Sequence, residues 1–309
     1  MLGAMLFPAP PAPVFPAEQA TTVDHTPRYE DCTQDGRLNT LAIPPSLAST
    51  WNAREAVYPA IRRARAKGLV SLLTRLTVAS FDAPVRVNRP FEVTGGFQLA
   101  HDRDASGAVS RLFMNVWTSI RGRPHLPREA WDAARASGQS EQLVLAGHAF
   151  AEHTYTRPFG PPDRRKVLSL AGVEGLPDVP EARYHQPAPT TAADAPEGAT
   201  WIDELAPDPV DTMFTLDQTD ANQHVNSLIY VRVFLAAVQR RLASGGHPAR
   251  VRSKGFDIAY RKPSFVGDRI RAHIRMFAHA DGHIGGAGFL AADGEEARPR
   301  CYVRAVYGP

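Results

Sequence analysis

The sequence predicts an α+β fold made of two similar units in tandem. The first observation is a set of landmarks that recur in the same order in the two halves of the 309-residue chain. The second is a long stretch in the second half with apolar residues at helical spacing. The third is a series of segments in both halves where apolar and polar residues alternate, as in half-buried strands. Together they predict that each half contains a turn, a helix and several long strands.

The recurring landmarks are short residue pairs. Phe81-Asp82 in the first half matches Phe256-Asp257 in the second, and Arg89-Pro90 matches Lys262-Pro263. Both halves then continue into an alternating, strand-like segment. The shared order indicates a diverged tandem duplication.

A polar segment precedes each set of landmarks, and the two segments can also be aligned. The alignment begins with Asp35 opposite Asp220. At the next positions it pairs residues of different chemistry, Arg37 on Asn222 and Asn39 on His224. Since only the second half carries the full polar set, we expect one active site per chain.

The duplication sets the predicted domain organisation. Residues 1–22 form a disordered, Pro-rich N-terminus, and residues 23–177 form the first unit with an inserted segment. Residues 178–200 are rich in Pro, Ala and Thr and form a linker. Residues 201–309 form the second unit, which carries the site.

One helix is predicted in each unit. In the second unit it covers Val225 to Ala243, where a mostly apolar stripe recurs at helical spacing and Gly245-Gly246 follows. In the first unit it covers residues 45–67, where Pro59 should kink or split it.

Composition excludes several classes of function. The chain has 35 basic and 32 acidic residues, a net charge of only +3, and no basic stripe of the kind that binds nucleic acid. The sequence contains no stretch of 18 uninterrupted apolar residues, so no membrane-spanning helix is expected. Cys32 and Cys301 are too few for a disulfide framework, and the first twenty residues lack the basic start of a secretory signal. We therefore expect a cytoplasmic protein.

The segment 217–231 contains the residues best suited to chemistry. Asp220, Asn222 and His224 lie within five residues, just before the predicted helix. A helix N-terminus has unpaired N–H groups that can stabilise an oxyanion, and a histidine can act there as a general base. A carboxylate can orient the imidazole, and an amide can position water or a carbonyl. The alternative is purely structural, because Asp and Asn are common helix caps and His224 could be a turn residue.

The same residues carry a family resemblance. The stretch D-A-N-Q-H-V-N-S-x-x-Y, residues 220–230, resembles the D-x-N-x-H-V-N-N-x-x-Y motif of plant and bacterial acyl-acyl carrier protein (acyl-ACP) thioesterases. These enzymes belong to the hotdog-fold superfamily and contain two hotdog units in one chain. The resemblance implies an α+β tandem (double) hotdog fold, in which two antiparallel sheets are each wrapped around a long central helix. It also implies that Asp220, Asn222 and His224 form the catalytic group.

Two departures from the family concern carboxylates. The plant members carry a glutamate in the helix where this chain has Ala236, and another in the next strand where it has Pro263. Losing both would weaken the activation of water, or indicate a changed reaction. Ser227 also replaces the asparagine that the family usually has.

The resemblance implies hydrolysis of a fatty-acyl or polyketide-acyl thioester on a carrier protein or coenzyme A (CoA). We expect Asn226, Tyr230 and Lys262 to contact the substrate, and no metal or organic cofactor to be needed. The chain would be a monomeric pseudo-dimer or a homodimer. One alternative is dehydration, isomerisation or cyclisation of a carrier-bound polyketide in the same pocket, and another is acyl binding without catalysis.

Overall fold

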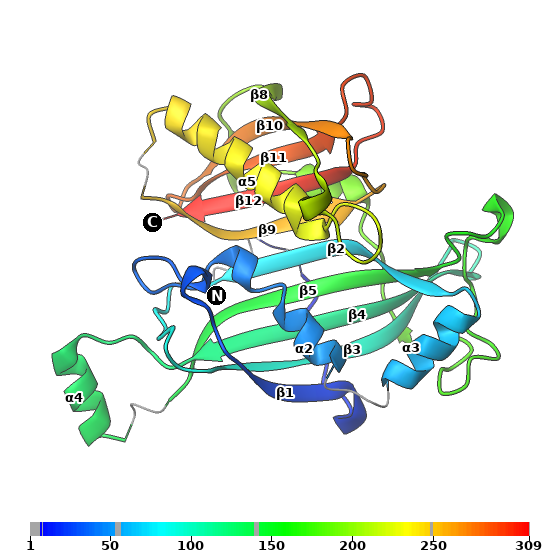
Figure 1. Ribbon diagram of the computed structural model, residues 1–309, viewed down its shortest axis with the longest axis horizontal. Coiled ribbons are helices and arrows are strands. Elements are labelled where there is room, and N and C mark those ends of the chain that lie inside the picture. The colour runs from blue at the N-terminus through cyan, green and yellow to red at the C-terminus, as the bar shows by residue number, and fades with distance from the viewer. Residues whose placement is uncertain (1–6, 8, 53–56, 139–141, 248–249, 309) are drawn as a thin grey trace. The chain divides into compact units, whose positions relative to one another are not determined.

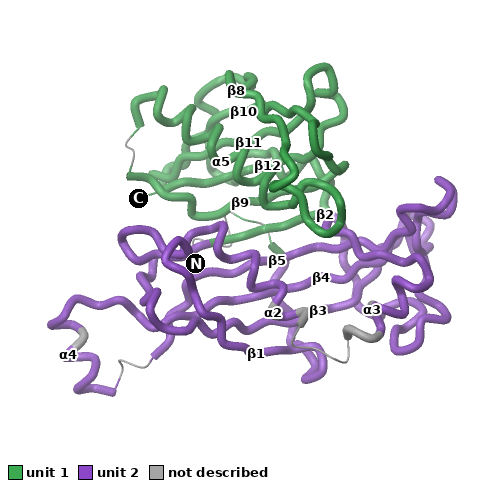
Figure 2. Tube along the Cα trace, viewed as in Figure 1, with its two compact units in different colours: residues 1–9, 75–79, 187–309 green, residues 10–74, 80–186 purple. Residues whose placement is uncertain are grey.

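The computed structural model describes all residues except 1–6, 8, 53–56, 139–141, 248–249 and 309 (Figure 1). The chain forms two compact units (Figure 2). Unit 1 contains residues 1–9, 75–79 and 187–309, and unit 2 contains residues 10–74 and 80–186. The predicted linker, 178–200, therefore includes the point where the chain passes from unit 2 to unit 1.

Unit 2 is built on long antiparallel strands that pair in the order β1-β3-β4-β5-β2. A short strand, β6, pairs with β3 in parallel. The strands of this unit are β1 (Ala20–His25), β2 (Val70–Ser80, of which residues 75–79 belong to unit 1), β3 (Phe91–Arg103), β4 (Val109–Gly122), β5 (Val144–Thr156) and β6 (Ala182–Arg183).

The helical segments of unit 2 are short. α2 packs on β1, β3 and β4, whereas α4 stands apart from these strands in Figure 1. The helices are η1 (Ala17–Gln19), η2 (Tyr29–Asp31), η3 (Thr40–Ala42), α2 (Ser46–Asn52), α3 (Val57–Ala66), α4 (Arg128–Ala136) and η5 (Pro162–Arg164).

Unit 1 repeats this plan with one long helix. Its strands pair in the order β8-β10-β11-β12-β9, and residues 75–79 of β2 add to the free edge of β9. α5 packs on β8, β10, β11 and β12. The elements are η6 (Pro189–Ala193), β7 (Ala199–Trp201), β8 (Ala206–Met213), η7 (Leu216–Gln218), α5 (Ser227–Ser244), β9 (Arg252–Tyr260), β10 (Arg269–His279), β11 (Ile284–Ala291) and β12 (Cys301–Gly308).

The two units therefore share one order of elements, although they differ in their helices. A helix was predicted over Val225 to Ala243, and α5 covers Ser227–Ser244. A single long helix was also expected over residues 45–67. There the structure has α2 and α3, with residues 53–56 between them outside the described part. Pro59 lies in the first turn of α3, where its missing N–H costs no helical hydrogen bond.

Part of the segment predicted to be disordered is ordered. Residues 20–22 begin β1, and Phe7 is only 2% exposed. Phe7 packs with Ala79, Phe277 and Val306 over Gly255, where a Cβ atom would lie 2.6 Å from the Phe7 ring. The aromatic ring thus occupies space that the missing side chain leaves, which explains why a Pro-rich segment is fixed at this point.

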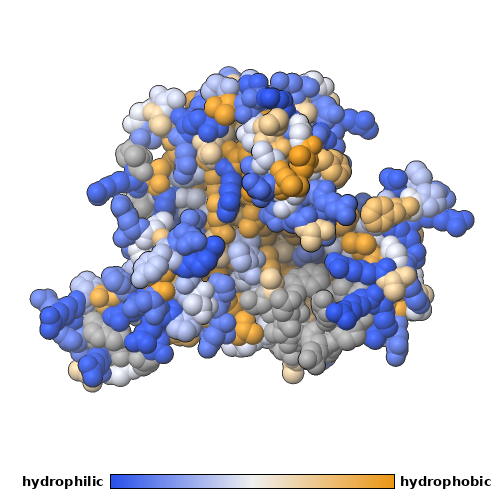
Figure 3. Space-filling view, viewed as in Figure 1, coloured by the Kyte–Doolittle hydropathy of each residue, from blue (hydrophilic) through white to orange (hydrophobic). Residues whose placement is uncertain are grey.

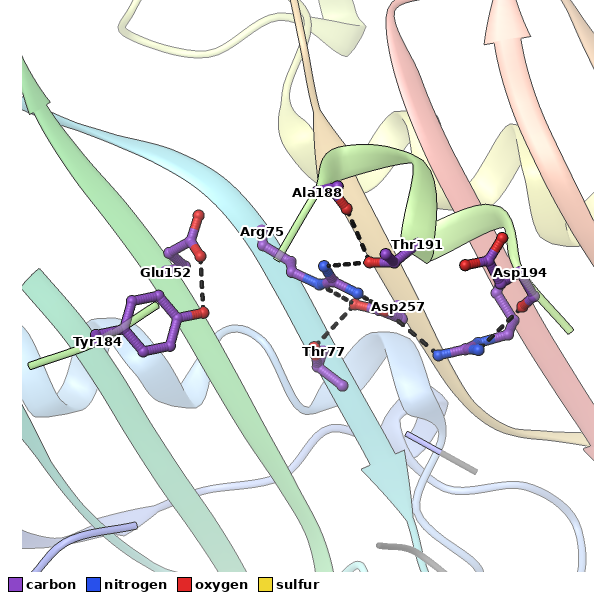
Figure 4. Close-up of polar contacts among 9 residues, drawn as sticks. Arg75, Thr77, Glu152, Tyr184, Ala188, Thr191, Asp194 and Asp257 are labelled. Atoms are coloured by element: carbon purple, nitrogen blue, oxygen red, sulfur yellow. Dashed lines mark hydrogen bonds and ion pairs between the residues drawn. The ribbon is translucent and has the colours of Figure 1, made fainter. Parts of the chain in front are cut away.

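Each part of the predicted linker packs against strands of the unit to which it belongs. In unit 1, η6 contacts β9, β11 and β12. Thr191 accepts a hydrogen bond from Arg75, whose guanidinium forms a buried, two-bonded ion pair with Asp257 (2.9 and 2.5 Å; Figure 4). In unit 2, Tyr184 donates to buried Glu152 (2.8 Å). The linker is therefore held by polar contacts at both of its ends.

Candidate active site

The predicted catalytic residues lie on a tight loop between η7 and α5. Thr219 and Val225 form an antiparallel bridge that closes it. Inside, the Asp220 N–H donates to the His224 carbonyl (3.1 Å) and the Gln223 N–H donates to the Asp220 carbonyl (2.9 Å). The loop is thus a turn followed by a residue in the left-handed region, Gln223, at φ 66°.

The Asp220 carboxylate holds this loop together. One oxygen accepts from the Asn222 N–H (2.8 Å) and the other from the Asn226 side-chain amide (3.2 Å). Among the residues that the structure describes, none of its hydrogen bonds goes to the His224 ring. Its position therefore fixes the path of the loop, while the expected contact with the imidazole is not formed.

His224 is half-buried, and its ring is oriented by the backbone. Nδ1 lies 3.2 Å from the Val225 carbonyl oxygen. A carbonyl only accepts hydrogen bonds, so Nδ1 carries the proton and Nε2 keeps its lone pair in the neutral ring. Nε2 has no partner among the described residues. This leaves it available as a base.

The two asparagines of the motif have different surroundings. Asn222 is exposed, and its side chain makes no hydrogen bond within the described part of the chain. Asn226 is the N-cap of α5, accepting from the Leu228 N–H (3.0 Å) while its amide donates to Asp220. Asn222 is therefore free to meet a ligand, whereas Asn226 connects loop to helix.

Tyr230 and Lys262, expected to contact substrate, also make contacts that support the fold. Tyr230 is buried, and its hydroxyl accepts from the Ser264 N–H (2.7 Å). The neighbouring Tyr260 hydroxyl donates to the Ser227 carbonyl (3.0 Å), and burial raises the pKa of both phenols, so both stay neutral at pH 7. Lys262 forms an ion pair with Glu295 (2.6 Å).

No carboxylate stands at the two positions where the family has glutamates. Ala236 is a half-buried residue of α5, and Pro263 is exposed in the connection between β9 and β10. Within the described ranges there is also no group of three or more His, Cys, Asp or Glu side chains that could hold a metal. The chemistry available to the loop is that of His224, Asn222 and backbone N–H groups.

The structure corrects the alignment of the two polar segments. Cys32 and Leu38 form the bridge that corresponds to Thr219 and Val225. The Gly36 N–H donates to the Thr33 carbonyl (2.9 Å), as Gln223 does to Asp220, and Asn39 caps η3 as Asn226 caps α5. The corresponding pairs are therefore Thr33 with Asp220, Asp35 with Asn222, Gly36 with Gln223, Arg37 with His224 and Asn39 with Asn226.

The register predicted from Asp35 and Asp220 was wrong by two residues, because it matched identical side chains and not the turn. A shared left-handed residue gives the true register, since Gly36 has φ 79°. At the position of His224 the first loop carries Arg37, which pairs with Asp35 and Asp82. This loop has no base at the corresponding position. Gln223 has no distinguishing pattern in the sequence, and its backbone conformation identifies it in the structure.

Exposed apolar side chains border the loop in unit 1. The Phe214 carbonyl accepts from the Gly267 N–H (2.9 Å), which joins the end of β8 to the β9–β10 connection. Apolar surface appears over the turn from β8 into η7 (Figure 3). The exposed residues of these segments are Met213, Leu216, Phe265 and Val266, each 49–72% exposed.

The structure is similar to solved thioesterase structures along most of the chain. A protein from Lactobacillus plantarum described as an oleoyl thioesterase has a TM-score of 0.59 at 12% identity, over 94% of this chain and 96% of that one. An acyl-ACP thioesterase from Bacteroides thetaiotaomicron has a TM-score of 0.57 at 14% identity, over 94% and 98%. The 12:0-ACP thioesterase from Umbellularia californica has a TM-score of 0.58 at 14% identity, over 94% and 97%. The chain has a hotdog fold.

The hotdog fold is shown by structure alone. No protein-family model matches the sequence, and no curated protein matches it. Similarity at 12–14% identity establishes the fold and leaves the reaction to be argued from the site. Among the described helices, none has the length and apolar character needed to cross a membrane.

Proposed function

We propose that this chain hydrolyses acyl thioesters at the loop formed by residues 220–224. The observation that carries the proposal is the orientation of His224. Its Nδ1 faces the Val225 carbonyl, which leaves Nε2 free to accept a proton, one turn before a long buried helix. A neutral imidazole held in this way is a suitable general base for water.

Each part of the reaction has a candidate group. His224 Nε2 takes a proton from water, and the water oxygen attacks the thioester carbonyl carbon. The Ser227 N–H, at the first position of α5, has no acceptor within the described residues and is suited to the oxyanion that forms. Asn222 positions the water or the carbonyl, and Asp220 keeps the loop in place. The tetrahedral intermediate then expels the thiolate, which takes up the proton.

The comparisons support a proposal for the substrate class. Two of the similar structures are acyl-ACP thioesterases by name, so we propose an acyl group carried on a carrier protein or CoA. We further propose that each unit is one hotdog, with the site in unit 1. α5 would be the central helix of unit 1, and α2 with α3 its divided counterpart in unit 2.

A second candidate keeps the pocket and changes the reaction. Within the described residues no carboxylate contacts the His224 ring, and neither Ala236 nor Pro263 supplies one. An unassisted base could instead remove a proton from a carrier-bound intermediate, in dehydration, isomerisation or cyclisation. Mass spectrometry would then find a modified acyl group still attached to its carrier, with no free thiol.

The test is thiol release from a panel of acyl-CoA and acyl-carrier thioesters. We expect His224→Ala to lower kcat by roughly 10²- to 10⁴-fold, the usual contribution of a general base. Arg37→Ala is the matched control, because Arg37 occupies the corresponding position of the other loop, and it should retain full activity. Undiminished release by His224→Ala, or no release with any ester, would refute the proposal.

A further inference from the structure

Gln223 has a backbone conformation that favours glycine. Its φ of 66° lies in the left-handed region, and it is the one non-glycine residue of the described chain with positive φ. In the other loop the corresponding residue is Gly36, at φ 79°. Both positions follow a turn whose closing geometry requires this conformation, and glycine adopts it without a steric penalty.

Nothing in the fold offsets this cost. The Gln223 side chain is exposed and makes no hydrogen bond with any residue that the structure describes. Its neighbours differ, because Asp220 and Asn226 use their side chains to hold the loop and the helix. A strained residue whose side chain does not contribute to the fold suggests a role outside it.

The position of Gln223 indicates what that role is. It lies at the solvent side of the loop, between Asn222, which is exposed, and His224, which is half-buried. A carboxamide both donates and accepts hydrogen bonds, and it carries no charge. Its natural partner is another amide. An acyl chain offers no such group, and it would avoid a solvent-exposed position.

We infer that Gln223 contacts the substrate by hydrogen bonding to an amide of the pantetheine arm. This inference rests on the proposed function, in which the acyl group is carried as a thioester of that arm in CoA or a carrier protein. The arm contains two amides close to the sulfur. Gln223 therefore binds the thiol side of the substrate, while His224 acts at the carbonyl.

The test compares Gln223→Gly with wild type on one acyl group carried by two thiols. Pantetheine has amides, and ethanethiol has none. We expect kcat/KM to fall about three- to tenfold on the pantetheine ester, mainly through KM, as the loss of one hydrogen bond implies. On the ethanethiol ester it should stay within about twofold. Tm should rise by a few degrees, because glycine relieves the strain.

Gly36→Gln is the matched control for strain. It places the same side chain at the corresponding position of the other loop, and it should lower Tm while leaving both rates unchanged. Unchanged kcat/KM for Gln223→Gly on the pantetheine ester would overturn the inference. Equal losses on both esters would also overturn it, because Gln223 would then act only through the position of His224.

A failure of the proposed function can be told apart from a failure of this inference. If the wild-type protein releases no thiol from any ester, hydrolysis is refuted. The contact is then tested by calorimetric binding of an acyl-pantetheine thioether, which cannot be hydrolysed. Three- to tenfold weaker binding by Gln223→Gly would support the inference, and equal affinity would overturn it.

Discussion

At the scale of single residues, the Asp220 carboxylate contacts the loop and not the imidazole. Its two carboxylate oxygens accept from the Asn222 N–H and from the Asn226 amide. A carboxylate in contact with a histidine would stabilise the charged ring. Here the ring is oriented by the Val225 carbonyl. The contribution of Asp220 to catalysis should therefore depend on acceptor geometry more than on charge.

Two substitutions at Asp220 should therefore differ in their effects on kcat and on stability. Asp220→Asn keeps one acceptor for the Asn222 N–H, and we expect it to retain a large part of kcat and of the free energy of unfolding. Asp220→Ala removes both acceptors, so it should cost about 1–3 kcal/mol and most of kcat. Urea unfolding and thiol release measure the two quantities. Equal, large losses of activity in both variants would instead indicate that the negative charge is required.

His153 should make the stability of the fold sensitive to acid. It lies on β5 with Nδ1 3.2 Å from the Met114 carbonyl, and burial lowers its pKa to about 4. The unfolded chain has a histidine pKa near 6.5, so between about pH 6.5 and 4 the unfolded state binds more protons. The free energy of unfolding should therefore fall as pH is lowered through this range and level off below it.

Urea unfolding at pH 7.5, 6.0 and 5.0 measures that dependence. His153→Gln removes the titration and should give a shallower loss of stability on acidification. His185→Gln is the control, because the side chain of His185 is 89% exposed, and it should follow wild type. Identical pH profiles for wild type and His153→Gln would contradict the assignment.

The position of the polar loop could be predicted from the sequence, but the contacts of each residue in it could not. The motif around Asp220, Asn222 and His224 stands out because polar residues end abruptly at an apolar helix. It does not reveal that the Tyr230 hydroxyl accepts from the Ser264 N–H. That contact joins residues that only folding brings together, and no local pattern encodes it.

At the scale of elements, the N-cap residue of α5 joins the helix to the loop. Asn226 accepts from the Leu228 N–H and also donates to Asp220, so one side chain joins the helix to the loop. Asn226→Ala should cost about 1–2 kcal/mol and lower kcat, because both contacts are lost. Asn39→Ala is the matched control, since it caps η3, of three residues, in the other loop.

Urea unfolding and thiol release of the two variants test this. We expect Asn39→Ala to lose less stability and to keep kcat. If Asn226→Ala retained full stability and activity, the cap would not be what holds the loop against the helix.

Elements with a regular pattern were the best predicted. The helix of unit 1 was found within two residues, because its apolar stripe is nearly continuous. Its counterpart in unit 2 occupies two pieces, and the sequence offered only Pro59 as a warning. The left-handed residue that relates the two loops is glycine in one copy and glutamine in the other, so matching residue types could not find it.

At the scale of the whole molecule, unit 1 contains a buried network of charged residues. Asp257 is fully buried between Arg75 and Arg304, with Thr77 donating to the same carboxylate (2.9 Å). Arg304 also donates to the carbonyl of linker residue Asp194 (2.9 Å). One carboxylate therefore balances two guanidinium groups under the linker.

Asp257→Asn should be strongly destabilising, by about 3–5 kcal/mol, because it removes the buried negative charge that both guanidinium groups contact. Asp211→Asn is the control, because Asp211 pairs with an Arg269 side chain that is 63% exposed. This substitution should cost less than about 1 kcal/mol. Urea unfolding compares the two. A similar, small loss in both would contradict the importance of the buried network.

In the proposed reaction, water attacks a thioester carbonyl beside His224. Running the reaction in ¹⁸O-labelled water and analysing the acyl product by mass spectrometry tests this step. We expect the wild-type protein to release a carboxylic acid carrying one ¹⁸O atom, and His224→Ala to release almost none. An unlabelled product, or an altered acyl group still attached to its carrier, would contradict hydrolysis at this site.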